Sequence, residues 1–268
     1  MRHDELGPAG YFPPSVLTGV LQESAIDGSA ATGFPFAWYL RERAFWVIRR
    51  ITFRHERPLR YGDSLEVTTW VSTIRKTSST REYRLESPSR GETIGRARVH
   101  WVYVDATTGQ PKPLPESIRV AFAPTDDLEP VLEGVPDTAQ RLDPGRPAWT
   151  AERFAEPGDV DLFGHVKCCR YVNWLEDLMG RAFALAGAAP GTASLASFDL
   201  QLLSSARGGE TVQARAHADP VWSAEMVGPQ DRLVARAALW PCTPDPARRV
   251  FASLDADLAA RLRAGPRA

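Results

Sequence analysis

Apolar residues recur at helical spacing in two segments of the chain. Over residues 15–33, Leu17, Val20, Leu21 and Ala25 fall on one face, and Gly33 follows as a stop signal. Over residues 170–187, a second face carries Tyr171, Trp174, Leu175, Leu178, Met179 and Ala182. The pattern predicts one amphipathic helix in each half of the chain.

After each predicted helix the apolar spacing changes to two, which is typical of half-buried β-strands. The strand-like segments are 45–53, 65–71, 83–85 and 94–103 in the first half, and 197–203, 210–218, 221–227 and 232–240 in the second. The order of a helix followed by strands therefore occurs twice. The local match of 57–67 to 204–214 supports an internal duplication.

Between the two repeats the chain changes composition. Residues 123–148 are rich in proline and acidic residues and show no sustained period, which indicates a linker. We therefore expect an N-terminal unit over 1–122, a linker over 123–148 and a C-terminal unit over 149–268. Because each helix must bury its apolar face against a sheet, the predicted class is α+β.

Composition and charge exclude several classes of function. The 268 residues carry 32 basic and 33 acidic side chains without a block of one sign, so we expect no nucleic-acid partner and no basic membrane patch. The N-terminus lacks a signal-peptide pattern, and no apolar run is long enough to span a bilayer. The three cysteines form no CxxC pair, which favours a reducing, cytoplasmic setting.

The segment 159–176, DVDLFGHVKCCRYVNWLE, places acids and a lone histidine at the start of the second predicted helix. Unpaired amides in the first turn of a helix favour negative charge, so a substrate carbonyl could bind there. Asp161 could act on a bound substrate or cap the helix, and His165 could be catalytic or only hydrogen-bonded. Cys168 could be a nucleophile at a helix start or a small packing residue.

The chain resembles the acyl-ACP thioesterases, which are double hotdog proteins. The resemblance rests on LQESA, GDSLEVTTWVS and RARVHWVYVDATTGQP in the first half and on DVDLFGHVKCCRYVNWLE in the second. Members typically show D-x-D-x-N-x-H-V-N-N-x-x-Y at the latter site. This chain keeps Asp159, Asp161, His165, Val166 and Tyr171 but has Phe163 at the asparagine position. The glutamate expected near residues 204–206 is absent.

The resemblance implies two hotdog units, each with a central helix wrapped by a curved antiparallel sheet. It also implies a thioesterase that hydrolyses fatty or polyketide-like acyl chains bound to acyl carrier protein or coenzyme A. Asp161 would serve as base or nucleophile and His165 as its polar partner, without a metal or organic cofactor. The enzyme would be a monomer or a homodimer.

Two further residues are expected to contact substrate. Phe163 makes the pocket apolar, which suits a bulky acyl chain. Tyr11 lies in GYFPP, which is similar to the G-H-F-P opening of hotdog dehydratases with tyrosine in the histidine position. The N-terminal unit would then hold a degenerate site.

Two alternatives remain open at this point. The altered acid and base set and the dehydratase-like opening are also consistent with a dehydratase, isomerase or cyclase acting on a carrier-tethered polyketide chain. Phe163 and the missing glutamate are consistent with a non-catalytic acyl-binding protein. On either view Glu176 is expected on a solvated helix face.

Overall fold

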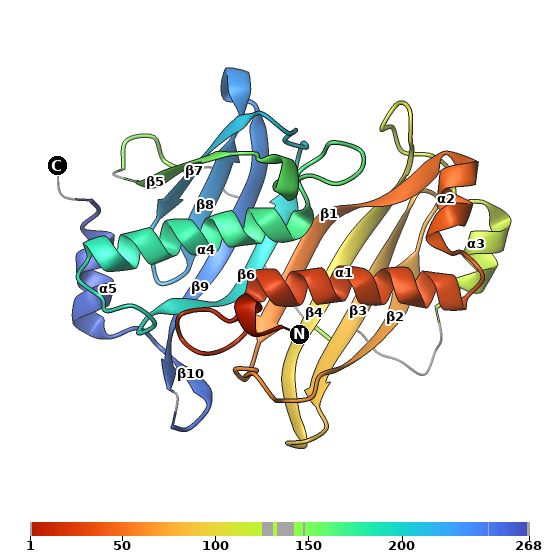
Figure 1. The fold of residues 1–268 in the computed structure, drawn as a ribbon. Helices are drawn as coiled ribbons and strands as arrows, with labels where there is room; N and C mark the ends of the chain where they lie inside the picture. The colour runs from red at the N-terminus through yellow and green to blue at the C-terminus, as the bar shows by residue number, and fades with distance from the viewer. Residues whose placement is uncertain (1, 125–130, 133–141, 147, 246, 267–268) are drawn as a thin grey trace.

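The computed structural model describes residues 2–124, 131–132, 142–146, 148–245 and 247–266. Its centre is one ten-stranded antiparallel sheet in the order β2-β3-β4-β1-β6-β9-β8-β7-β5, with β10 paired to β9 (Figure 1). The strands are β1 (Ala44–His55), β2 (Glu66–Ile74), β3 (Ser78–Ser87), β4 (Glu92–Asp105), β5 (Trp149–Phe154), β6 (Ser194–Leu202), β7 (Thr211–His217), β8 (Trp222–Val227), β9 (Leu233–Asp245) and β10 (Val250–Ala252).

The sheet has the same strand order on both sides of its middle. From the β1–β6 pair outward, one side runs β1-β4-β3-β2 and the other runs β6-β9-β8-β7, with β5 added at the edge. β1 and β6 join the halves over four residue pairs, from Arg50↔Gln201 to Phe53↔Phe198. The topology therefore repeats, as the sequence pattern predicts.

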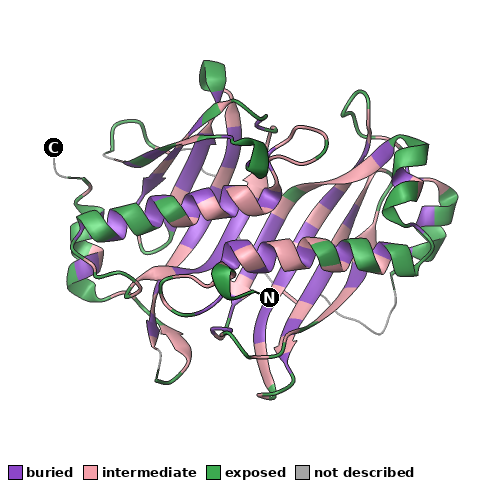
Figure 2. Ribbon diagram, viewed as in Figure 1, coloured by how far each residue is buried: buried purple, intermediate pink, exposed green. Residues whose placement is uncertain are grey.

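Two long helices, α1 (Pro14–Ala31) and α4 (Cys168–Leu185), lie side by side on one face of the sheet (Figures 1 and 2). Leu17, Leu21 and Ala25 of α1 are buried as predicted, whereas Val20 remains partly exposed. All six residues predicted for the apolar face of α4 are buried. Full burial of one large apolar side chain contributes about 1.5–3 kcal/mol, so these faces hold both helices on the sheet.

The opposite face of the sheet is covered by paired charges. Side chains alternate along a strand, so Ile51 and Phe53 of β1 point to the core while Arg50 points away from it. Arg50 pairs with Asp199 at 2.6 Å, and on the neighbouring strands Arg98 pairs with Glu82 at 2.7 Å. Both carboxylates on this face are therefore compensated by an arginine.

Several short elements have no clear sequence period and were not predicted. They are α2 (Phe36–Glu42), α3 (Glu116–Ala121), α5 (Ala256–Arg263) and the 3-10 turns His3–Glu5, Pro157–Asp159 and Pro229–Asp231. α2 and α3 place Tyr39 and Ile118 in a second apolar cluster at one end of the sheet. Each of these helices has fewer than nine residues, which is too short for a repeated apolar spacing to be recognised.

Most of the predicted linker, 123–148, lies outside the described residues, so the proposed boundaries at 122 and 149 stay a prediction. Among the helices that the structure describes, none is long and apolar enough to cross a membrane.

Candidate active site

The segment before α4 forms a tight hairpin. Val160 and Val166 face each other across it, and the hydrogen bonds Asp161 N to His165 O (2.8 Å) and Lys167 N to Asp159 O (2.9 Å) flank the pair. Gly164 has a φ of +76°, a conformation that glycine adopts most easily. The sequence therefore returns the chain on itself directly before the helix begins.

Asp161 holds this turn together and still has one oxygen available. Its Oδ1 accepts hydrogen bonds from the backbone N–H of Phe163 (2.9 Å) and of His165 (3.0 Å). No described residue donates to its Oδ2, and none bonds the His165 imidazole. Both side chains are half-buried. The turn thus places the Asp161 carboxylate against the backbone of His165, and it gives Asp161 a structural role.

The first turn of α4 offers hydrogen-bond donors that have no oxygen acceptor among the described residues. Lys167 is the N-cap residue and its side chain does not cap the helix. The N–H groups of Cys168 and Cys169 have no carbonyl or carboxylate acceptor within the described part of the chain. Free amides at a helix start, next to an acid and an imidazole, can receive an oxygen that gains negative charge.

In the first turn of α1, the equivalent hydrogen-bond donors are bound by a residue from the C-terminal half of the chain. Glu176 of α4 accepts from Ser15 N at 2.9 Å and from Ser15 Oγ at 2.5 Å. α1 has no other side-chain cap. A carboxylate is the favoured group at the positive end of a helix, so Glu176 fills the position that a substrate oxygen would take.

This contact corrects the expectation that Glu176 lies on a solvated face. The residue is half-buried against α1, and burial raises the pKa of its carboxyl group to about 7. Sequence spacing within α4 could not show this, because the neighbour that buries Glu176 comes from the other half of the chain.

A loop after β6 supports the hairpin and was not recognised from the sequence. Val166 N donates to Ala206 O at 2.9 Å, and Ala206 N donates to the Tyr171 hydroxyl at 2.9 Å. On the other side Asp159 is buried and pairs with Arg170 at 2.6 Å. Asp159 and Tyr171 therefore position the hairpin, which gives Asp159 a structural role.

The two predicted substrate-binding rings face protein atoms. Phe163 stacks on Phe45 of β1 with ring centroids 4.0 Å apart. Tyr11 is 2% exposed and its ring packs against His55 and Phe251. A substrate contact at either ring would require these neighbours to move, so their roles in binding stay predictions.

Cys168 does not have the properties of a nucleophile. It is buried, and burial raises the pKa of its thiol well above the usual range. Burial also raises the pKa of the Cys169 thiol, although Arg170 and Lys167 act in the opposite direction. A thiol must ionise to attack a thioester, so the packing interpretation of Cys168 is favoured.

A cavity of about 750 Å³ lies beside α1. Its walls combine apolar side chains with the loop that leads into β2, and they comprise Phe12, Val20, Ser24, Tyr61, Gly62, Asp63, Ser64, Leu65 and Val67. None of the four predicted site residues is among them. The cavity is large enough for an acyl chain, but it is separate from the hairpin in its lining.

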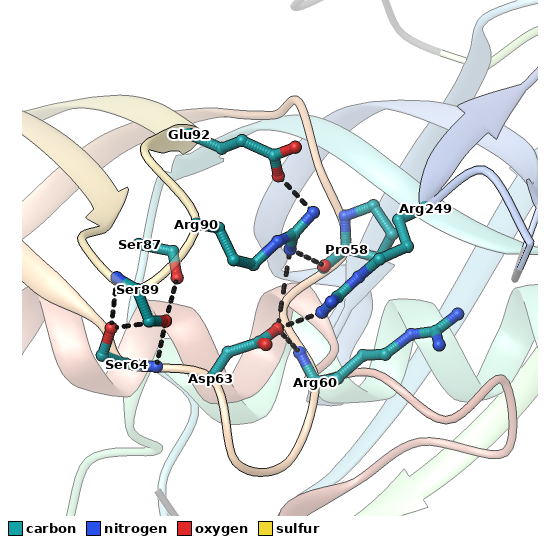
Figure 3. A network of polar contacts seen from close by, with 9 residues as sticks. All are labelled: Pro58, Arg60, Asp63, Ser64, Ser87, Ser89, Arg90, Glu92 and Arg249. Carbon is teal, nitrogen blue, oxygen red and sulfur yellow. Dashed lines mark hydrogen bonds and ion pairs between the residues drawn. The ribbon is translucent and has the colours of Figure 1, made fainter.

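The loop that forms this wall is held by Asp63 (Figure 3). Its carboxylate accepts from Arg60 N at 2.9 Å, pairs with Arg90 at 3.5 Å, and also pairs with Arg249, which precedes β10. Ser64 and Ser89 hydroxyls add a further contact at 2.8 Å. The C-terminal half thus fixes one wall of a cavity in the N-terminal half.

Replacing Asp63 by asparagine is expected to destabilise the protein by about 2 kcal/mol, because both arginines lose a charged acceptor in a mostly buried network. Urea unfolding of the variant measures the loss. The matched control is Asp231→Asn, an exposed acid that forms no ion pair with a described residue. Equal stability of the two variants would contradict the role given to the network.

Comparison with known proteins finds relatives that are similar in sequence. Residues 7–122 match the family described as acyl-ACP thioesterase N-terminal domain. The N-terminal half of the chain is therefore similar to this domain of the acyl-ACP thioesterases. It is 24% identical over 191 residues to a chloroplastic palmitoyl-acyl carrier protein thioesterase of Gossypium hirsutum, and 27% identical over 184 residues to a chloroplastic acyl-[acyl-carrier-protein] hydrolase of Cuphea viscosissima. Each match covers 65% of this chain and 44% of the relative, so the chain spans under half of their length.

Solved structures confirm the double hotdog fold of this chain. An acyl-ACP thioesterase from Bacteroides thetaiotaomicron superposes with a TM-score of 0.75 at 19% identity, covering 90% of this chain and 94% of that one. The 12:0-ACP thioesterase of Umbellularia californica gives 0.70 at 18% identity, covering 91% and 95%. The α+β class and the two helix-and-sheet units predicted from the sequence are therefore confirmed.

Proposed function

We propose that this protein hydrolyses acyl thioesters carried by acyl carrier protein. The family match and the names of the relatives support this reaction class. One structural observation carries the proposal. At the start of α4, the amides of Cys168 and Cys169, which have no oxygen acceptor among the described residues, lie directly after a turn in which Asp161 accepts from His165 N.

The proposed reaction uses these groups in order. A water oxygen adds to the thioester carbonyl carbon while its proton passes to Asp161 Oδ2 or His165, or Asp161 itself attacks and water later cleaves the acyl-enzyme. The carbonyl oxygen, now negative, receives hydrogen bonds from the first turn of α4. The C–S bond then breaks, the sulfur leaves and takes up a proton, and a free acid remains.

The same geometry supports assigning the reaction to the C-terminal unit. In the N-terminal unit the Ser15 N–H is occupied by Glu176, and Tyr11 is enclosed by protein. We propose accordingly that 1–122 is a hotdog unit with a degenerate site and that 149–268 holds the working one. The oligomeric state, monomer or homodimer, and the cytoplasmic location stay predictions.

One experiment tests the function. The pure protein is incubated with acyl-ACP and acyl-CoA substrates of several chain lengths, and free thiol and product mass are followed together. We expect equal amounts of thiol and free acid, with faster release from acyl carrier protein. A mass change with the thioester intact would favour a dehydratase, isomerase or cyclase. Tight binding of substrate without turnover would favour an acyl-binding protein.

A further inference from the structure

The loop after β6 brings one arginine next to the hairpin. His165 and Arg207 form an antiparallel bridge, flanked by the hydrogen bonds Val166 N to Ala206 O (2.9 Å) and Gly208 N to Gly164 O (3.2 Å). This pattern makes them a non-hydrogen-bonded pair, in which Cα atoms lie about 4.5 Å apart. Side chains of such a pair leave the ladder on the same face. The Arg207 side chain therefore starts beside that of His165.

The positive charge of Arg207 is not compensated within the described chain. Its side chain is exposed and forms no ion pair with a described residue. The nearest acid in the loop, Glu210, accepts the backbone N–H of Arg207 at 3.1 Å and pairs with the guanidinium of Arg232. Since Glu210 forms its ion pair with Arg232, the guanidinium of Arg207 remains available to a bound substrate.

The hairpin before α4 has no side-chain hydrogen-bond donor at position 163 for the carbonyl oxygen of the thioester. The Phe163 side chain has no hydrogen-bond donor, and its ring is stacked on Phe45. The amides of α4 alone would have to stabilise the oxygen that gains charge. An arginine carries several N–H donors and a full positive charge, which together suit a developing oxyanion.

We propose that Arg207 is a further catalytic residue, whose guanidinium donates to the thioester carbonyl oxygen as this oxygen becomes negative. This inference rests on the proposed function and adds a cation to the groups of Asp161, His165 and α4. The proton and the leaving sulfur follow the course given above, and Arg207 neither gains nor loses a proton. The phosphate of the carrier arm is a poor candidate for Arg207, because the pantetheine chain separates it from the thioester that His165 would contact.

The test measures kcat and KM for acyl-ACP hydrolysis in Arg207→Ala, Arg207→Gln and Arg207→Lys. We expect the two neutral variants to lose roughly 10- to 50-fold in kcat with little change in KM. This loss is smaller than the roughly 10²- to 10³-fold typical of a buried oxyanion donor, because water surrounds an exposed side chain. The lysine variant should keep most of the activity, since it keeps the charge.

A second variant separates catalysis from structure. Adding Phe163→Asn to Arg207→Ala supplies an amide donor in the hairpin, and we expect it to recover at least part of the lost kcat. Arg181→Ala, an exposed arginine on α4 without a described ion pair, is the matched control and should behave as wild type. A thermal melt of each variant shows that folding is intact.

The outcomes distinguish failure of the Arg207 role from failure of the proposed thioesterase function. An active wild type with an Arg207→Ala variant of unchanged kcat, or with an effect confined to KM, overturns the inference and leaves the thioesterase standing. A wild type that releases no thiol from any acyl thioester overturns both. Loss in both neutral variants, with retention in the lysine variant, supports the inference.

Discussion

Replacing Asp161 by asparagine is expected to lower kcat/KM for acyl-ACP hydrolysis by about 10²- to 10⁴-fold while leaving the fold intact. The amide oxygen of asparagine can still accept the hydrogen bonds that Oδ1 receives from Phe163 N and His165 N, so the turn is kept. The second oxygen, however, is replaced by an amide nitrogen that cannot take a proton from water or attack a carbonyl carbon. The variant thus removes the chemistry of Asp161 and preserves its structural role.

Steady-state kinetics and a urea unfolding curve measure the two effects separately. Asp161→Ala serves as a comparison, because it also removes both backbone contacts and should cost about 1–3 kcal/mol of stability in addition. Cys168→Ala is the control for the neighbouring thiol, and its activity should match that of wild type. If Asp161→Asn keeps activity within a few-fold of wild type, Asp161 is a turn residue only.

His165→Gln completes this test, because glutamine is polar but cannot act as a base. We expect a loss of kcat similar to that of Asp161→Asn, and a double variant with little further loss, since both residues serve one proton transfer. Additive losses would mean that the two residues act in separate steps.

The helices and strands could be read from the sequence because their signals are local. Leu17 and Leu21 on α1, and Trp174 and Leu178 on α4, repeat at helical spacing, and burial in the structure follows that spacing. The hairpin around Asp161 and His165 is also short-range, with a glycine at its turn, although the sequence analysis predicts only the helix that follows it. These parts depend on neighbours in the chain, which a single sequence shows.

The contacts that decide the site were less predictable, because they join residues far apart in the chain. Glu176 was expected in solvent, yet Ser15 from the other half buries it. The sequence favours a solvated position for Arg207, as for Arg57 and Arg60, whereas the bridge places it opposite His165. A strand register between loops, and the packing of one helix on another, leave no periodic signal in the sequence.

The contact of Glu176 with Ser15 leads to a strong dependence of stability on pH. Burial, the largest cause, raises the pKa of the Glu176 carboxyl group from 4.5 to about 7, and the nearby charge of Asp177 adds to this, whereas the hydrogen bonds from Ser15 act against it. The folded protein therefore holds this proton to a higher pH than the unfolded chain does. Stability from the neutral carboxyl group is complete below pH 4.5 and is lost as pH rises through 7.

The variant Glu176→Gln is accordingly expected to match wild type in its free energy of unfolding near pH 4.5 and to exceed it above pH 7. The difference should grow to about 3 kcal/mol, since each pKa unit corresponds to about 1.4 kcal/mol. Glutamine can keep both contacts, because its oxygen accepts from Ser15 N and its amide donates to Ser15 Oγ. Urea unfolding of both proteins across this pH range gives the difference directly.

Comparing the two proteins at each pH removes the contribution of other titrating groups. Burial lowers the pKa of His55 to about 3, so this residue makes stability fall as pH decreases, opposite in sign to Glu176, but it is present in both proteins. Glu23→Gln is the matched control, because Glu23 is exposed on α1 and forms no ion pair with a described residue. The difference in free energy of unfolding between Glu176→Gln and wild type could stay constant with pH, or the control could show the same pH dependence. Either result would mean that the Glu176 carboxyl group, bound to Ser15 of α1, does not ionise near neutrality.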